Sequence, residues 1–148
     1  MKKTKWNTLI KNLLLSAFTI MILFSMESCA RKEKFLISTV TPAARGYATV
    51  KKDKNKNYVI SVQLLDLAEV SRLQPVKQVY VVWMVTDHEV TQNIGRLNSA
   101  MTHSKKLLAS LATASPFKPA KIFITAEDDA NVQIPNGQVV LSTGKFKN

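Results

Sequence analysis

The clearest pattern in this chain is an alternation of apolar and polar positions, which predicts β-strands. Along residues 57–67 the apolar positions of one face are Tyr58, Ile60, Val62 and Leu64. A period of two residues with β-branched and aromatic side chains is typical of a strand that buries one face. The segment 76–86 is apolar on both faces in its centre, which predicts a central strand of a sheet.

Shorter apolar segments predict the remaining strands, at residues 46–50, 94–98, 104–113, 121–126 and 138–146. The segment 104–113 also fits one face of a helix, but its short length and its neighbours favour a strand. Turns are expected at 51–57, 87–89 and Asn136-Gly137. Gly95, inside the expected strand at 94–98, marks a bulge or a close approach of the backbone. Six to seven strands without a confident helix predict an all-β fold, an antiparallel β-sandwich.

The first thirty residues have the pattern of an exported protein's leader. Lys2, Lys3 and Lys5 form a basic start, and an uncharged, mostly apolar stretch follows from residue 12 to residue 26. As a helix, residues 13–26 would be about 21 Å long, which is short for a hydrocarbon core of about 30 Å. We therefore expect residues 1–28 to be a helical signal peptide rather than a permanent membrane span.

The single cysteine of the chain, Cys29, lies directly after this apolar stretch. The segment Met26-Glu27-Ser28-Cys29 resembles a bacterial lipobox, with an apolar residue three positions before the cysteine and a small one directly before it. This resemblance implies cleavage before Cys29 and its modification by a diacylglyceryl group and an N-acyl chain such as palmitate. Such an anchor holds a protein on its membrane. Ala30 follows the cysteine, and we favour the outer membrane over the inner.

Cleavage would leave 120 residues, which we divide into a lipidated tether at 29–44 and a sandwich domain at 45–148. Residues 35–40 could already form a strand within that tether. The mature part carries 17 basic and 9 acidic residues, a net charge of +8. Export and the lack of interleaved aromatic residues argue against a nucleic-acid partner. The expected partners are the membrane and an envelope protein or glycan.

Two charged segments are candidate binding loops. Lys51, Lys52, Lys54 and Lys56 lie in an expected hairpin, where the simpler interpretation is a solvated turn and the functional one a patch for anionic headgroups or acidic polysaccharide. Glu127, Asp128 and Asp129 form an acidic loop. That loop lacks the alternating ligand spacing and the glycine of a calcium site.

The second half of the chain resembles the extracytoplasmic domain of the anti-sigma-K factor family. The matching residues are Tyr80, Trp83, Ile94, Gly95, Leu97, Ile124, Glu127, Pro135, Gly137 and Val139-Val140-Leu141-Ser142. The resemblance implies an Ig-like sandwich in an extracytoplasmic setting. Nothing in the chain resembles the sigma-binding helices of that family, so sigma-factor control is not implied. For Trp83 itself we expect packing across the two sheets, as a core aromatic.

The sequence offers no catalytic or metal-binding constellation. His88 and His103 are the only histidines and have no further cysteine beside them, whereas zinc requires three or four nitrogen or sulfur ligands. We expect no metal, no cofactor and no enzymatic activity. The leading hypothesis is a non-catalytic envelope lipoprotein that presents a sandwich for binding. The alternatives are an accessory component of envelope signalling and a small hydrolase with a site involving Asp87, His88 or Glu89.

Overall fold

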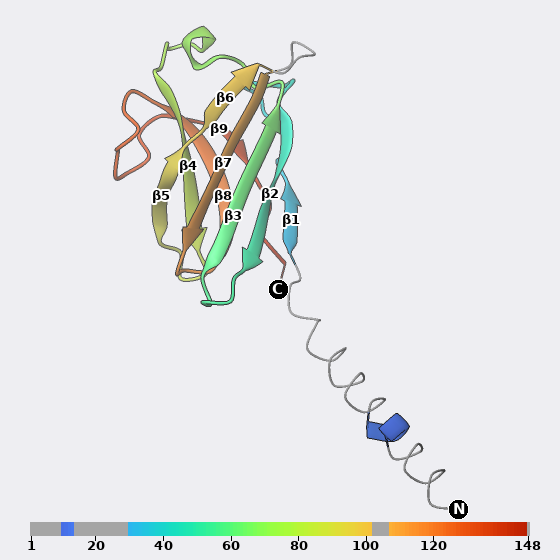
Figure 1. Ribbon diagram of the computed structural model, residues 1–148. Helices are drawn as coiled ribbons and strands as arrows, with labels where there is room; N and C mark the ends of the chain where they lie inside the picture. The colour runs from blue at the N-terminus through green and yellow to red at the C-terminus, as the bar shows by residue number, and fades with distance from the viewer. Residues whose placement is uncertain (1–9, 14–29, 102–106, 148) are drawn as a thin grey trace, which may run out of the picture.

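Two antiparallel sheets packed face to face form the folded domain (Figure 1). The computed structural model describes residues 10–13, 30–101 and 107–147. In these residues the strands are β1 Arg31–Lys34, β2 Arg45–Lys52, β3 Tyr58–Leu65, β4 Val79–Thr86, β5 Thr91–Arg96, β6 Asn98–Met101, β7 Leu107–Ser115, β8 Pro119–Glu127 and β9 Gln138–Ser142, with a short 3-10 helix at Val70–Arg72. The expected all-β sandwich is therefore confirmed, with more strands than the six to seven expected.

The strand order is that of an immunoglobulin-like sandwich. One sheet has the order β1-β2-β3-β7-β6 and the other β5-β4-β8-β9. With β2 to β9 read as strands A, B, C, C′, D, E, F and G, these sheets are A-B-E-D and C′-C-F-G, which is the Ig arrangement. β1 is an additional strand at the edge of the first sheet, next to β2.

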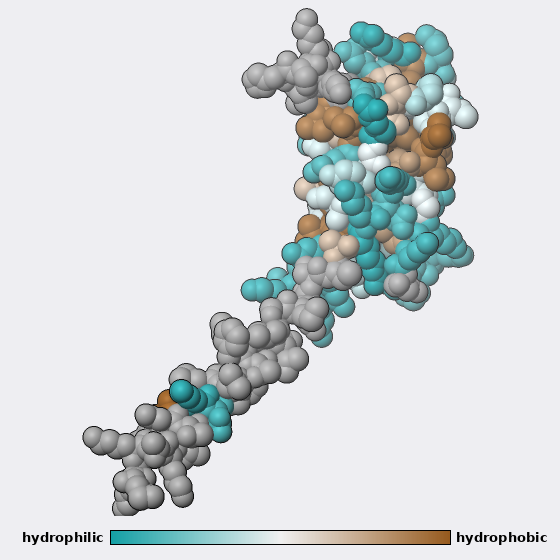
Figure 2. All heavy atoms as spheres, turned by 90° about the vertical axis from the view of Figure 1, so that its right-hand side faces the viewer, coloured by the Kyte–Doolittle hydropathy of each residue, from teal (hydrophilic) through white to brown (hydrophobic). Residues whose placement is uncertain are grey.

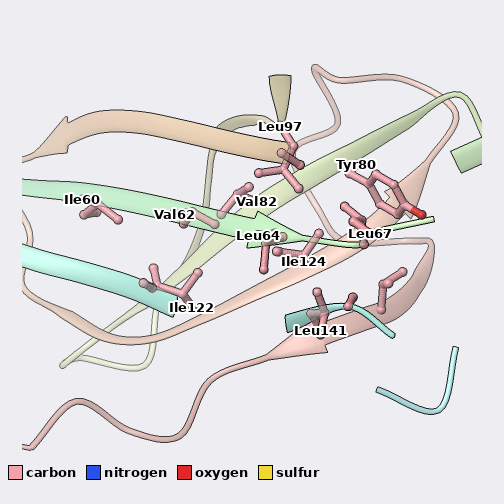
Figure 3. Packing of buried hydrophobic residues seen from close by; sticks show 14 of the residues in the cluster. Ile60, Val62, Leu64, Leu67, Tyr80, Val82, Leu97, Ile122, Ile124 and Leu141 are labelled. Atoms are coloured by element: carbon pink, nitrogen blue, oxygen red, sulfur yellow. The ribbon is translucent and has the colours of Figure 1, made fainter. Parts of the chain in front are cut away.

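The core lies between the two sheets and is built by the alternation seen in the sequence. From the five-stranded sheet, Ile60, Val62 and Leu64 point inward, as expected from their shared face (Figure 3). From the four-stranded sheet, Val82 and Ile124 meet them. Each of these five side chains is fully buried, and burial of one such side chain is worth about 1.5–3 kcal/mol.

The segment assigned to the tether belongs to the sandwich. β1 pairs with β2, Arg31 opposite Val50 and Lys34 opposite Tyr47. Phe35 then forms an isolated bridge with Thr143, the residue that follows β9 of the other sheet. The domain boundary at residue 45 was thus placed too late, because β1 consists only of charged residues and shows no apolar alternation. A strand was considered at residues 35–40, but the strand observed lies just before them.

Beyond β1, the chain closes one side of the sandwich through a buried hydroxyl. Ser38 Oγ donates to the carbonyl oxygen of Val140 at 2.5 Å and accepts from the backbone N–H of Thr41 at 2.9 Å. Ser38 and Thr41 are both buried. These bonds fasten the segment between β1 and β2 to β9.

The expected strand at 94–98 is in fact divided between the two sheets. β5 ends at Arg96 in the four-stranded sheet, and β6 begins at Asn98 in the five-stranded one. Leu97 is the crossing point: its side chain is buried and its N–H donates to the carbonyl oxygen of Tyr80. Apolar pattern alone does not reveal such a change of sheet, because the strand character continues on both sides.

Within residues 1–28, the expected signal peptide, the structure describes only residues 10–13, and they are helical. Cys29 lies outside the described residues. In the described part of the chain, no helix has the length and hydrophobicity needed to cross a membrane.

Candidate binding groove at the β8–β9 loop

Trp83 faces outward from the four-stranded sheet, and it is nevertheless completely buried. Its neighbours in β4, Val82 and Met84, belong to the core between the sheets, whereas Trp83 does not. The indole lies beside Phe123 of β8, with 6.2 Å between ring centroids and 14° between ring planes. The expectation that Trp83 packs across the sheets was therefore wrong, and something must cover the outer face of this sheet.

A buried chain of hydrogen bonds connects Trp83 to the loop between β8 and β9. Trp83 Nε1 donates to Thr125 Oγ1 at 2.8 Å, and the Thr125 hydroxyl donates to Glu127 Oε1 at 2.6 Å. The same carboxylate oxygen accepts from the backbone N–H of Asn136 at 3.1 Å. Glu127 is only 2% exposed. The carboxylate thus fixes the returning end of the loop against the sheet.

The middle of the same loop is held by Asn93 of β5. Its side-chain amide nitrogen donates to the carbonyl oxygens of Ala130 at 2.9 Å and Val132 at 2.8 Å, while its oxygen accepts from the N–H of Gly95 at 2.9 Å. Asn93 pairs with Trp83 in the sheet. With one attachment at Asn93 and another at Glu127, the loop passes over the outer face where the indole is buried.

A β-bulge shapes the strand that carries Asn93. The register between β4 and β5 shifts at this point, where Val82 lies opposite Gly95 and Trp83 opposite Asn93. Gly95 has φ +128°, a conformation that residues with a Cβ rarely adopt. The sequence-based expectation that Gly95 marks a bulge is confirmed.

A groove of about 790 Å³ lies between β5 and this loop. The residues that line it are Thr91, Gln92, Asn93, Gly95, Arg96, Ala130, Asn131 and Gln133. Amides and a hydroxyl offer both donors and acceptors, and the exposed Arg96 adds a guanidinium that binds carboxylates in a planar, bidentate way. The groove is thus equipped to bind polar, extended ligands that carry an anionic group.

The positions of the family resemblance form the scaffold of this groove. Besides Trp83, Gly95 and Glu127, they include Gly137, where a Cβ would collide with the carbonyl oxygen of Ala126. Pro135 is half-buried in the loop that Glu127 anchors. Glu127 and Gly137 hold the loop, and Gly95, which has no side chain, is the one residue of the resemblance that lines the groove.

Tyr80 fixes the neighbouring loop between β3 and β4. Its hydroxyl donates to the carbonyl oxygen of Ala68 at 2.9 Å, and burial raises the pKa of Tyr80 to about 12. At the end of that loop, Lys77 Nζ lies 2.7 Å from Asp128 Oδ2. The β3–β4 and β8–β9 loops are thereby joined by an ion pair.

The acidic candidates therefore have two different environments. Glu127 was expected in a solvated loop, but it is buried because it is the last residue of β8 and its carboxylate turns back under the loop. Asp128 and Asp129 are exposed, as expected for a loop. Asp129 Oδ1 accepts from the N–H of Asn131, which shapes the turn beside the groove.

The lysine-rich candidates lie in the β2–β3 hairpin, far from the groove. Asp53 organises the turn, since its Oδ1 accepts from the backbone N–H groups of Asn55 and Asn57 at 2.8 Å each. Lys51, Lys52, Lys54 and Lys56 are all exposed. The expectation of a hairpin turn is confirmed, and the hairpin and the acidic loop form two separate surfaces.

The candidate hydrolytic residues form an exposed turn between β4 and β5. His88 Nε2 lies 3.8 Å from Asp87 Oδ1, and Glu89 has φ +62° at the end of that turn. His103 lies outside the described residues. Within residues 30–101 and 107–147, no group of three or more His, Cys, Asp or Glu side chains is gathered that could hold a metal ion.

Comparisons of this chain with protein-family models, with curated proteins and with solved structures find no match. The description of the groove therefore rests on the structure of this chain alone. Reasoning from the sequence missed Asn93, Arg96, Thr125 and Gln133, because isolated amides, hydroxyls and one arginine form no motif. The glycine of the bulge was the one local signal near them.

Proposed function

We propose that this protein is a non-catalytic envelope lipoprotein, anchored through Cys29, whose sandwich binds a segment of a partner protein in the groove beside β5. The arrangement of the strands supports this orientation. The chain enters the domain at β1, at one edge of the sandwich, and the groove lies along β5, at the opposite edge of the other sheet (Figure 1). A domain held at β1 would keep its groove accessible.

The observation that carries the proposal is the position of β5. It is the edge strand of the four-stranded sheet, so one side of its backbone is not paired within the sheet. An extended peptide can add to such an edge through main-chain hydrogen bonds, with side chains on the host providing specificity. Here Gln92 and Gln133 offer amides, and Arg96 offers a partner for a carboxylate.

A protein segment fits these features better than a glycan. Sugar rings commonly stack on exposed aromatic faces, and none of the described residues that line the groove is aromatic. The nearest aromatic pair, Trp83 and Phe123, does not line the groove, and the Trp83 ring is fully buried. Main-chain and amide recognition therefore explains the lining more completely than stacking does.

The second candidate is an accessory role in envelope signalling, favoured by the resemblance to the anti-sigma-K factor family. The residues of that resemblance build the loop scaffold of the groove. In this case the partner segment would belong to a membrane-spanning signalling protein. A neighbouring gene for a sigma factor or an anti-sigma protein would favour this candidate over a general envelope partner.

Site-specific photocrosslinking in living cells tests the groove. We would place p-benzoylphenylalanine at Gln133, and at the exposed Ala112 on the outer face of the other sheet as a control. We expect one defined polypeptide adduct from Gln133, weakened by Arg96→Ala and absent from Ala112. A glycan partner would give an adduct that glycan-degrading enzymes remove. The same adducts from both positions, unaffected by Arg96→Ala, would refute a specific groove.

A further inference from the structure

The lysine-rich hairpin lies at the end of the sandwich where the chain enters. Arg31, the first residue of β1, pairs with Val50, and Lys52 is the last residue of β2. The hairpin between β2 and β3 therefore extends beyond the start of β1. Figure 1 shows this hairpin, the start of β1 and the C-terminus at the same end of the domain.

The described fold leaves almost no tether at this end. Only Ala30 separates Cys29 from β1, so the two Cα atoms of Cys29 and Arg31 lie at most about 7 Å apart in an extended chain. From Val50 to Lys52, β2 continues by two residues, which is also about 7 Å. If Cys29 carries the lipid, the hairpin reaches about as far toward the bilayer as the anchor does.

The surface at this end is basic where it is closest to the anchor. Lys51, Lys52, Lys54 and Lys56 are exposed on the hairpin, and Lys145 and Lys147 are exposed near the C-terminus. Figure 2 views the molecule from the side that carries β1, and many hydrophilic residues lie on the lower half of this side.

The acidic groups near this end oppose the lysines only weakly. The Asp53 carboxylate is occupied by backbone N–H groups of its own turn. Glu33 is half-buried beside Gly144. Asp87 and Glu89 lie in the β4–β5 turn, where the Asp87 N–H donates to the carbonyl oxygen of Lys118 in the β7–β8 turn. The exposed lysines at this end therefore outnumber the acidic groups, and the surface keeps a basic surplus.

An exposed aromatic side chain, Phe117, lies in the turn next to the lysine-rich hairpin. Tyr58 pairs with Ser115, which places the β7–β8 turn next to the hairpin. Phe117 in that turn is 48% exposed. Aromatic side chains beside basic ones are typical of surfaces that rest at the level of lipid headgroups.

We propose that this end of the sandwich, with the β2–β3 hairpin at its centre, docks on the anionic lipid surface of the anchoring membrane and holds the domain upright. The inference rests on the proposed acylation of Cys29. Charges in the hairpin then lie within one Debye length, about 8 Å, of the headgroups. Each lysine there raises the equilibrium constant between the undocked and the docked orientation by about fivefold on an anionic leaflet. The groove beside β5 is thereby kept away from the bilayer surface.

Fluorescence quenching in vesicles tests the docked orientation. The acylated chain, with its lipid mass verified, would carry a thiol-reactive fluorophore at Asn55→Cys in the hairpin or at Ser71→Cys in the β3–β4 loop. Both positions are exposed. Vesicles would contain a headgroup-attached quencher in either phosphatidylcholine alone or a mixture with phosphatidylglycerol. Lack of the lipid mass would refute the proposed anchor, independently of the docking.

With the lipid mass present, we expect quenching at Asn55→Cys to be severalfold stronger than at Ser71→Cys in anionic vesicles. The difference should shrink in 1 M salt and in Lys51→Gln/Lys54→Gln, but not in the charge-matched Arg45→Gln/Arg72→Gln, whose side chains are exposed away from the hairpin. Equal quenching at the two positions would refute the upright orientation. Quenching that is the same with and without anionic lipid, at low and high salt, and in the lysine variant would refute the electrostatic docking.

Discussion

Replacement of Glu127 by alanine should destabilise the sandwich and release the β8–β9 loop. The Glu127 carboxylate accepts from the Thr125 hydroxyl and from the Asn136 N–H while being 2% exposed. Hydrogen bonds to a charged acceptor contribute about 1.5–3 kcal/mol each. Removal of the buried carboxylate also removes its desolvation cost, which offsets part of the loss. We therefore expect the free energy of unfolding to fall by about 2–4 kcal/mol.

Urea denaturation of a chain that begins at Ala30 measures this effect, since all nine strands lie after that residue. Trp83 is the only tryptophan from Ala30 onward and is linked through Thr125 to Glu127, so its fluorescence reports unfolding. Asp128→Ala is the matched control, because this exposed neighbour only forms a surface ion pair with Lys77, worth about 0–1 kcal/mol.

Hydrogen exchange at the Asn136 amide separates a local from a global effect. We expect faster exchange in Glu127→Ala than in Asp128→Ala under conditions where both are folded. A loss of less than about 0.5 kcal/mol in Glu127→Ala, with unchanged exchange at Asn136, is the size expected for an ordinary surface site. It would refute the role given to the carboxylate.

Two further substitutions test the scaffold around the groove. Gly95→Ala should cost about 1–3 kcal/mol of stability in urea denaturation, because alanine is strained at φ +128° and its Cβ would lie 3.3 Å from Leu111 Cδ1; an unchanged midpoint would contradict the bulge. Tyr80→Phe tests a pH dependence. The neutral phenol is favoured in the folded state, so its contribution is complete below pH 10 and is lost as the pH rises toward the folded-state pKa of about 12. Wild type should lose more stability than Tyr80→Phe across this range, and parallel pH profiles would contradict it.

The strands that could be predicted from the sequence are those in which the order of apolar and polar residues reflects which faces are buried. Alternation placed β3, and continuous apolar character placed β4 as a central strand, because these patterns follow directly from which faces are covered. The lysine-rich turn and the Gly95 bulge were also recognised, since they follow from local backbone chemistry. The antiparallel sandwich followed from the number and spacing of such segments, and its Ig-like character from the resemblance to the anti-sigma-K factor domain.

Other features depend on contacts that local pattern does not encode. β1 has the sequence Arg-Lys-Glu-Lys and is a strand only because β2 offers a free edge, where charged residues also discourage further pairing. Trp83 lies in a strand that is apolar on both faces, so its direction could not be read from the sequence. Trp83 can face outward and still be buried because the β8–β9 loop, attached by Asn93 and Glu127, covers the outer face of the sheet.

The groove was beyond sequence reasoning for a related reason. Its lining comes from β5 and from a loop more than thirty residues later, which only the folded sandwich brings together. The candidate residues from the sequence were charged clusters, of which the lysines lie in the β2–β3 hairpin of the other sheet and Glu127 is buried. Amides, a hydroxyl and an arginine at these positions form no motif with a recognisable spacing, so the sequence alone does not show that they lie together.

The central claim is a sandwich that is attached through Cys29 and faces its partner from the membrane surface. Intact mass of the protein extracted from membranes tests it most directly, with Cys29→Ala as the comparison. We expect a chain that begins at residue 29 and is heavier by a diacylglyceryl group and one N-acyl chain, and loss of this species in the variant. A full-length chain without lipid in both the wild type and the Cys29→Ala variant would contradict the proposed attachment.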